Sequence, residues 1–326
     1  MRNAITDVPG VLVGHVTLVG GGALTGTTVV AFPRGALVSV DVRGGAPATR
    51  DTAALDPRHG GRRVRGVVLT GGSAYGLAAA DGAAGVLGGF VPAAALFDLG
   101  RGGDFTARPG AAEGAEAARI AGPDVPQGNV GAGTGALNAA LKGGLGTASV
   151  SLGGGIVVGA VAALNAVGPS VDPTTGLPFA HALGLPGEFP APGGDDPAAV
   201  TRVEDRAAPF NTVIGVVATN ARFPHPYALA SAAQDGLALA VRPSHGLTDG
   251  DTVFAARTGD DGTRDDGTGE VEPRRVLDAA REVFARALVH GLLNAESVTT
   301  AWGALPAYRE LYPRTAARYR AGHRGN

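Results

Sequence analysis

The stretch "AAPFNTVIGVVATNA" (residues 207–221) decides how the chain is interpreted. A short polar pair, Asn211-Thr212, stands directly before the apolar, β-branched run from Val213 to Val217, which is typical of a buried strand. Such a junction is either an ordinary entry from a loop into a strand or a position at which the chain needs a hydroxyl group. The rest of the sequence distinguishes these two interpretations.

Length and composition limit the class of protein to which the chain can belong. With 326 residues, of which 44% are hydrophobic, the chain can bury a substantial core as one large domain or two average ones. A formal net charge of −2 gives no reason to expect nucleic acid or an anionic membrane as a partner. The absence of cysteine excludes disulfides and a cysteine nucleophile. Since the sequence also lacks a signal peptide or a span of membrane length, we expect a cytoplasmic protein.

Basic residues are distributed unusually. Of 27 lysines and arginines only one is a lysine, Lys142. An amine can be desolvated and its pKa shifted, whereas a guanidinium keeps its charge. The lone lysine is therefore either a surface residue without a function or a functional group.

Hydrophobic patterning predicts alternating short strands and helices without a fixed repeat. We expect strands over residues 11–18, 27–32, 36–42, 66–69, 93–99, 144–152, 155–164 and 212–219, and helices within 70–89 and over 111–120, 226–241 and 275–293. Ser73 is placed to cap the first helix. Residues 178–210, rich in Pro, Gly and Asp, are expected to form an exposed linker. The pattern predicts a layered α/β or α+β fold.

Most familiar catalytic motifs are absent from the sequence. It contains no P-loop, no H-E-x-x-H and no G-x-S-x-G, and its seven histidines are scattered without the spacing of metal ligands. We therefore expect neither a metal nor a cofactor, and no histidine-based triad.

One hydrolytic chemistry needs none of these groups. An N-terminal threonine can use its own α-amine as general base, because an α-amine has a pKa of about 7.7–8.0. An internal threonine acquires that amine only if the preceding peptide bond is cut. Thr212 follows the expected linker and begins a strand, so its hydroxyl could attack the Asn211 carbonyl and shift the acyl group from nitrogen to oxygen. This chemistry would explain why a hydroxyl stands at the junction.

Several ordered segments resemble the self-processing L-aminopeptidase/D-esterase family, also called the DmpA-like peptidases. They are "ITDVPGVLVGH" (5–15), "VLTGGSAYGLAAADG" (68–82), "ALFDLGRGG" (95–103), "GNVGAGTGA" (128–136), "LKGGLGTAS" (141–149), "NTVIGVVATNA" (211–221) and "DGDTVFA" (249–255). The resemblance runs over nearly the whole length, so it implies one domain processed into an α chain, 1–211, and a β chain, 212–326.

The resemblance also implies residue roles. Thr212 matches the nucleophile, Lys142 the lysine of the NylC-like, nylon-oligomer hydrolase branch, and Asn165 an asparagine that stabilises the oxyanion. Asp249 and Asp251 match an acidic pair near the nucleophile, and with threonine and this pair the chain is closer to the NylC-like branch than to the aminopeptidase branch.

These roles agree with simple physics. An amide N–H donor at a developing oxyanion is worth about 3 kcal/mol. An ammonium at Lys142 would favour the neutral amine of Thr212. Asp249 and Asp251, two residues apart on an extended segment, would point the same way and hold Lys142 or orient that amine.

Each candidate also has a purely structural alternative. Asp249-Gly-Asp251 is a common turn, and Asn165 alone could satisfy a buried backbone group. Ser73 and Tyr75 lie in a glycine-rich turn that either lines a substrate pocket or serves the helix.

For the fold, the resemblance implies a four-layer αββα sandwich of the N-terminal-nucleophile hydrolase type, and for assembly a homo-oligomer such as a tetramer of processed αβ units. Its activity would be hydrolysis of linear amides, in short peptides or 6-aminohexanoate oligomers. Two alternatives remain open at the level of sequence. An acyltransferase of the ornithine acetyltransferase type is disfavoured, because Ala-Thr in a K-G-x-G-M context is absent. The other is an uncleaved, non-catalytic binding protein.

Overall fold

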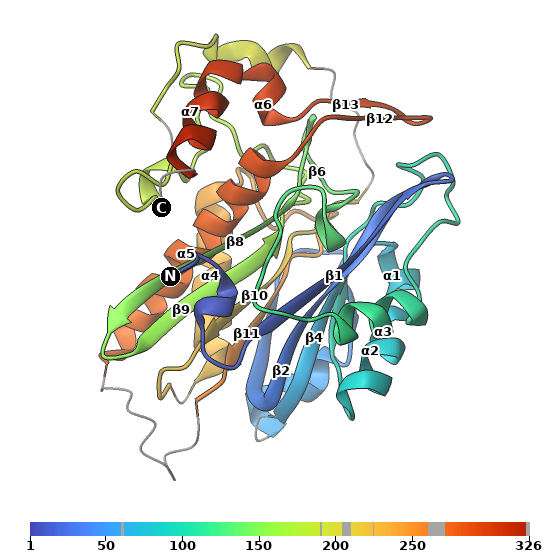
Figure 1. Ribbon diagram of the computed structural model, residues 1–326, viewed down its shortest axis with the longest axis vertical. Helices are drawn as coiled ribbons and strands as arrows, with labels where there is room; N and C mark the ends of the chain where they lie inside the picture. Colours follow the sequence, from blue (N-terminus) through green and yellow to red (C-terminus); the bar gives the residue numbers. More distant parts are fainter. Residues whose placement is uncertain (60–61, 190, 204–209, 224, 260–270, 324–326) are drawn as a thin grey trace.

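The computed structural model describes residues 1–59, 62–189, 191–203, 210–223, 225–259 and 271–323. Its largest element is a mixed sheet of nine described strands in the order β3-β5-β4-β2-β11-β10-β9-β8, with β1 paired to β2 (Figure 1). The strands are β1 (Leu12–Gly20), β2 (Ala23–Val42), β3 (Ala48–Arg50), β4 (Arg62–Thr70), β5 (Ala93–Ala95), β8 (Leu145–Gly153), β9 (Ile156–Ala163), β10 (Ile214–Thr219) and β11 (Thr252–Arg257).

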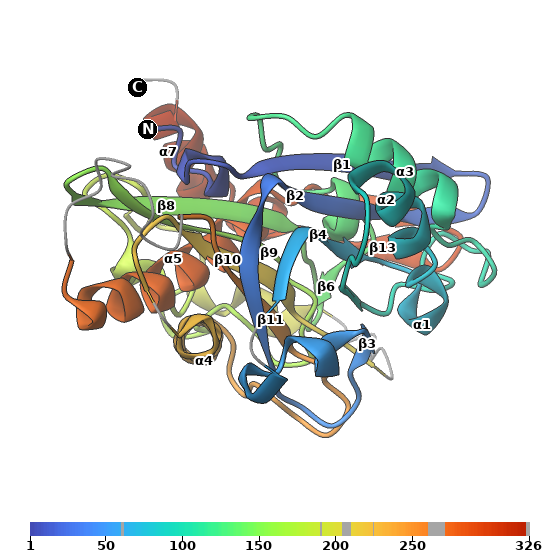
Figure 2. The same ribbon diagram turned by 90° about the horizontal axis from the view of Figure 1, so that it is seen from below.

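Helices cover the sheet from both sides (Figure 2), and two short hairpins form two-stranded sheets of their own. The helices are α1 (Ser73–Gly76), α2 (Ala79–Leu87), α3 (Ala111–Arg119), α4 (Pro226–Ala240), α5 (Pro273–Asn294), α6 (Tyr308–Leu311) and α7 (Pro313–His323). The hairpins are β6 (Leu137–Asn138) with β7 (Leu141–Lys142), and β12 (Val298–Thr300) with β13 (Gly303–Leu305). Within the described ranges, no helix combines the length and the apolar character needed to cross a bilayer.

Strand β2 joins the two halves of the sheet. Its first part pairs with β1 and its last part with β11, while β4 pairs with its middle, with a register shift in that pairing between Ala31 and Ala36. The two strands expected at 27–32 and 36–42 are therefore one strand of 20 residues. The length of β2 lets the sheet fold over so that the β4 half and the β10 half face each other.

Three buried apolar clusters lie between four layers, which are two half-sheets with a layer of helices on each outer side. Side chains of β10 alternate between two of these clusters. Ile214 and Val216 point into the cluster between the two half-sheets, whereas Val217 points into the cluster beneath α4 and α5. The third cluster lies between the β4 half and helices α2 and α3. The expected αββα sandwich is confirmed.

Two local expectations are wrong. Ser73 does not cap a helix with its side chain: Gly72 occupies the N-cap position, and Ser73 itself has a φ of 51°. Residues 178–210 are not simply an exposed linker. The described part contains short 3₁₀ turns, His181–Leu183 and Pro197–Arg202, and the side chain of Glu188 within it is only 5% exposed.

Candidate active site

Four strand ends meet at one edge of the sheet. Strands β10 and β11 are parallel, so residues that precede them lie at the same edge, and β9, antiparallel to β10, ends there. Strand β8, antiparallel to β9, begins there. This topology brings together Lys142 before β8, Asn165 after β9, Thr212 before β10, and the pair Asp249 and Asp251 before β11.

The Asn211–Thr212 peptide bond lies at the centre of this edge. Thr212 is 4% exposed, and its hydroxyl donates to the carbonyl oxygen of Asn211 at 2.6 Å. The backbone N–H of Gly250 donates to the same carbonyl oxygen at 3.2 Å, and the N–H of Thr212 donates to the backbone carbonyl of Asn165 at 2.6 Å. The hydroxyl, the carbonyl that precedes it and an N–H donor aimed at that carbonyl are thus in contact.

The side chain of Asn165 has a fixed orientation. Its Oδ1 accepts from the Arg101 guanidinium at 2.7 Å and from the backbone N–H of Leu137 at 3.0 Å. Because both donors hold the oxygen, the amide nitrogen must face the opposite way. That Nδ2 is buried and has no hydrogen-bond partner among the described residues. It is therefore an available donor on a residue whose backbone carbonyl contacts Thr212.

Lys142 is fully buried, and its environment differs from our expectation. Its ammonium donates to three backbone carbonyl oxygens, those of Gly133, Ala136 and Gly143, at 2.7 to 3.0 Å. Burial and the nearby Arg101 lower the pKa of Lys142 to about 7, and Asp98 partly opposes this shift. Neither Asp249 nor Asp251 is among its bonded partners, so the interpretation that the acidic pair holds Lys142 is wrong.

The acidic pair instead organises the backbone next to Thr212. Asp251 Oδ1 accepts from the N–H of Val213 at 2.9 Å, and its Oδ2 lies 2.8 Å from Nδ1 of His245. Asp249 Oδ2 accepts from the N–H of Gly246 at 2.8 Å. Both carboxylates face the 245–246 turn, as their spacing predicted. Burial and the charge of Asp251 raise the pKa of Asp249.

Three polar residues at this edge were missed. Arg101 and Asp98, both buried, follow β5, and His245 contacts Asp251. Burial raises the pKa of Asp98 to about 6 and lowers that of Arg101 to about 10. A signal was present in "ALFDLGRGG", where two charged residues follow directly on an apolar strand.

The two weaker candidates lie outside this set of contacts. Tyr75 is 61% exposed, and the Arg108 guanidinium lies 4.9 Å from the centre of its ring. Ser73 donates its backbone N–H to Leu96, and the neighbouring N–H of Gly72 donates to Asp98. Their role in substrate binding stays a prediction. The described residues also include no group of three or more histidines and acids able to hold a metal ion.

Comparison with known proteins identifies the family. The model of peptidase family S58 matches residues 3–305. The chain belongs to this family. It is 43% identical over 347 residues to an uncharacterized aminopeptidase of Mycobacterium tuberculosis, covering 95% of this chain and 98% of the relative. It is 31% identical over 280 residues to the 6-aminohexanoate-oligomer endohydrolase of a Kocuria species, covering 77% and 74%.

Solved structures of aminopeptidases superimpose on this chain. The β-aminopeptidase of a Burkholderia species superimposes with a TM-score of 0.73 at 25% identity, covering 98% of this chain and 94% of the other. The L-aminopeptidase D-Ala-esterase/amidase of Ochrobactrum anthropi, described as a variant of the N-terminal-nucleophile fold, gives 0.71 at 23% identity over 99% and 94%. This S58 chain has the same fold and is a hydrolase of amide or peptide bonds.

Proposed function

We propose that this S58 hydrolase is an N-terminal-threonine amidohydrolase that matures by cutting its own Asn211–Thr212 bond. The observation that carries the proposal is the 2.6 Å hydrogen bond from the Thr212 hydroxyl to the carbonyl oxygen of Asn211, which keeps the nucleophile next to the carbonyl group that it would attack. A nucleophile must lie within this kind of reach before it can attack.

The proposed maturation has two steps. The Thr212 oxygen adds to the Asn211 carbonyl carbon and its proton is taken up by the departing amide nitrogen, so that the C–N bond breaks and an ester joins Asn211 to Thr212. The N–H of Gly250, 3.2 Å from the carbonyl oxygen, would stabilise the negative charge that develops there. Water then hydrolyses the ester, which leaves a carboxylate on Asn211 and a free α-amine on Thr212.

The same groups support hydrolysis of a separate substrate. The freed amine of Thr212 would stay near the Asn165 carbonyl, which accepts from that nitrogen at 2.6 Å in the continuous chain. It would take the hydroxyl proton as the hydroxyl attacks the substrate amide. The unpartnered Nδ2 of Asn165 would then donate to the oxyanion. The buried positive charges of Lys142 and Arg101 would keep the amine in its basic, neutral form.

We propose linear amides as substrates, with short peptides first and 6-aminohexanoate oligomers second. The first class is supported by the aminopeptidase relatives and the second by the endohydrolase relative and by the Thr-Lys-Asn-Asp-Asp set of the sequence.

The test is to trap the acyl-enzyme. Mature protein is incubated with an aminoacyl p-nitroanilide and with a linear 6-aminohexanoate oligomer, quenched in acid, and its chains are weighed. We expect product release together with an acyl group on the chain that begins at Thr212. Thr212→Ala should show neither, whereas Thr201→Ala, an exposed threonine outside the site, should match the wild type. An acyl group on another residue would contradict the proposal.

A further inference from the structure

The guanidinium of Arg101 is a buried charge without a directly bonded carboxylate among the described residues, although the charge of Asp98 acts on it from nearby. Arg101 is 1% exposed, and no carboxylate of the described residues lies within ion-pair distance of it. Its hydrogen bonds go to three neutral oxygens, those of Gly135, Asn165 and Asn211, at 2.7 to 2.9 Å. Buried arginines are ordinarily paired with a carboxylate, so this one departs from the usual arrangement.

The two edges of this guanidinium are used differently. Nη1 donates to Gly135 and Asn165 and thus belongs to the permanent structure. Among the described residues, Nη2 donates only to the side-chain oxygen of Asn211, and Nε is buried without a partner. Nε and Nη2 are the two parallel donors of one edge, which matches the two oxygens of a carboxylate. A single amide oxygen satisfies only half of this edge.

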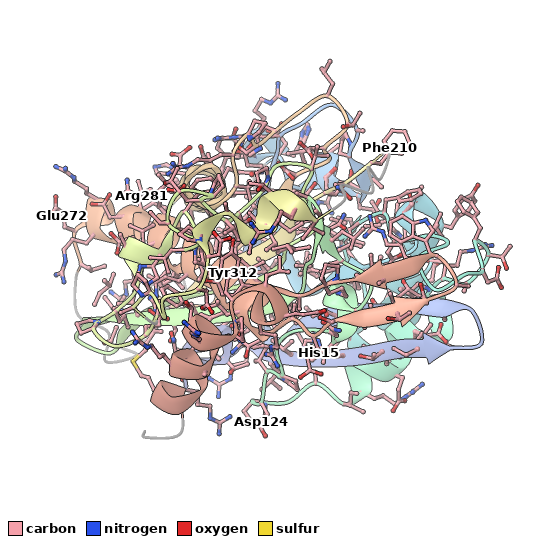
Figure 3. The ribbon with its side chains drawn as sticks, turned by 90° about the horizontal axis from the view of Figure 1, so that it is seen from above. His15, Asp124, Phe210, Glu272, Arg281 and Tyr312 are labelled. Atoms are coloured by element: carbon pink, nitrogen blue, oxygen red, sulfur yellow. The ribbon has the colours of Figure 1, made fainter. Side chains whose placement is uncertain are left out.

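Asn211 is the residue on the acyl side of the bond that maturation would cut. Its neighbour Phe210 is 46% exposed and reaches the surface, with its ring 6.0 Å from that of Phe97 (Figure 3). Asn211 itself is buried, and its side-chain oxygen accepts from Nη2 of Arg101 at 2.9 Å. Once the Asn211 side chain leaves Arg101 after cleavage, the Nε–Nη2 edge has no acceptor left among the described residues and becomes a buried, unsatisfied pair of donors.

We infer that this edge of Arg101 is a subsite for the acyl-side residue of the substrate, and that it favours a side-chain carboxylate in the place of the Asn211 amide. The inference rests on the proposed function, because a substrate carbonyl that replaces the Asn211 carbonyl beside Thr212 directs the side chain of its own residue toward Arg101. An aspartyl residue has the shape of asparagine and supplies the second oxygen. A leucyl residue has a similar shape and supplies none.

The main test uses wild-type mature protein and three nearly isosteric substrates, the p-nitroanilides of L-aspartate, L-asparagine and L-leucine. We expect kcat/KM to fall in that order, by about 10-fold from aspartyl to asparaginyl and by at least about 100-fold from aspartyl to leucyl, since buried donors reject a group that cannot pair with them. Equal rates for the three, or a preference for leucyl, would overturn the inference and would indicate that Asn211 remains on Arg101.

A second experiment tests ligand binding at the subsite independently of amide hydrolysis. Free L-aspartate and free L-leucine, at equal concentrations, are added to the mature protein and the melting temperature is measured. Stabilisation by aspartate and not by leucine supports the subsite even if no amide is hydrolysed, in which case the proposed function fails alone. Stabilisation by neither, or by both equally, counts against the subsite.

Arg101→Lys identifies the residue responsible. Lysine keeps the positive charge but not the two parallel donors. We expect the ratio of aspartyl to leucyl kcat/KM to fall at least about 10-fold, mainly through KM for the aspartyl substrate. Arg119→Lys, an exposed arginine on α3, is the matched control and should leave the ratio unchanged. An unchanged ratio in Arg101→Lys would overturn the assignment to this side chain.

Discussion

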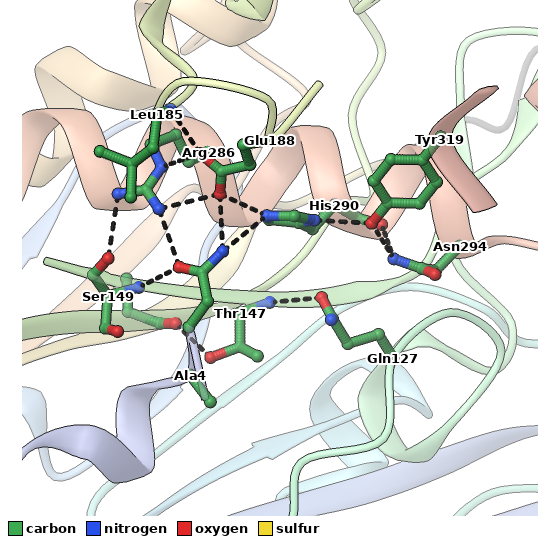
Figure 4. A network of polar contacts seen from close by, with 12 residues as sticks. Ala4, Gln127, Thr147, Ser149, Leu185, Glu188, Arg286, His290, Asn294 and Tyr319 are labelled. Carbon is green, nitrogen blue, oxygen red and sulfur yellow. Dashed lines mark hydrogen bonds and ion pairs between the residues drawn. The ribbon is translucent and has the colours of Figure 1, made fainter. Parts of the chain in front are cut away.

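Two buried clusters of polar and charged side chains in the described part of the chain are built on opposite principles. In one, Glu188 lies between Arg286 and His290, and Asn3 and Tyr319 complete the contacts (Figure 4). In the other, at the sheet edge, Arg101, Asn165, Asp249 and His245 each retain a buried atom without a partner among the described residues.

Pairing explains the difference in pKa shifts. Burial alone would raise the pKa of Glu188, but hydrogen bonds from His290 and Arg286 outweigh it and hold that pKa well below its usual range. At the sheet edge burial prevails, and the pKa values of Lys142 and Asp98 converge to about 7 and about 6. Complete pairing stabilises a junction between chain segments, whereas incomplete pairing leaves donors and protons available for chemistry.

The largest effect on stability is expected in the paired cluster. Glu188→Leu leaves Arg286 and His290 without their carboxylate, so the free energy of unfolding should fall by about 3–5 kcal/mol. The measurement is urea denaturation in a Thr212→Ala background, which keeps one continuous chain. Glu116→Leu is the control, because its ion pair with Arg119 is half-exposed and should contribute less than about 1 kcal/mol. An equal loss of unfolding free energy in the two variants would contradict the view that complete pairing of buried charges stabilises this cluster.

Replacing an asparagine by aspartate should lower activity in the sheet-edge cluster and stability in the paired cluster. Asn165→Asp keeps the oxygen that accepts from Arg101, adds a charge that pairs with it and removes the Nδ2 donor. We expect amide hydrolysis to fall by about 10²–10³ without loss of stability.

Asn294→Asp is the counterpart in the paired cluster. It removes donors to His290 and to Tyr319, so it should lower stability by about 1–3 kcal/mol and leave kcat unchanged. Steady-state kinetics and urea denaturation are measured for both variants. Full activity in Asn165→Asp would contradict the role of the free Nδ2.

A smaller effect concerns pH. The pKa of Lys142 is about 7 in the folded protein, below its ordinary value of 10.5, so above pH 7 the unfolded chain binds more protons at this residue than the folded chain. Stability should therefore rise with pH between about 7 and 9, by up to about 1.4 kcal/mol per pH unit from this group. In Lys142→Met that contribution is absent and the slope should be flatter by this amount. Parallel slopes in the two proteins would mean that Lys142 is not desolvated.

Much of the arrangement could be predicted because it follows from local patterns. The apolar runs that became β9 and β10 were recognisable, and the resemblance placed Lys142, Asn165, Thr212 and the acidic pair at one site. The contacts of Arg101 could not be predicted, because it lies 64 residues from Asn165 and 110 from Asn211, and only the folded sheet brings them together.

The acidic pair and the linker show two further limits. Spacing predicted that Asp249 and Asp251 share a face but not that His245 and the N–H of Val213 would be their partners. Composition predicted an exposed linker at 178–210, yet Glu188 within it finds two basic partners on α5, about 100 residues later in the chain. Pairing between distant segments arises from tertiary structure, so it cannot be predicted from local composition.

Under the proposed maturation, Thr212 becomes an N-terminal residue by its own reaction. The most direct measurement is the intact mass of freshly purified wild-type protein beside Thr212→Ala. We expect two chains in the wild type, 1–211 and 212–326, and one full-length chain in the variant. A single full-length mass in both proteins, or a cut at another bond, would contradict the account.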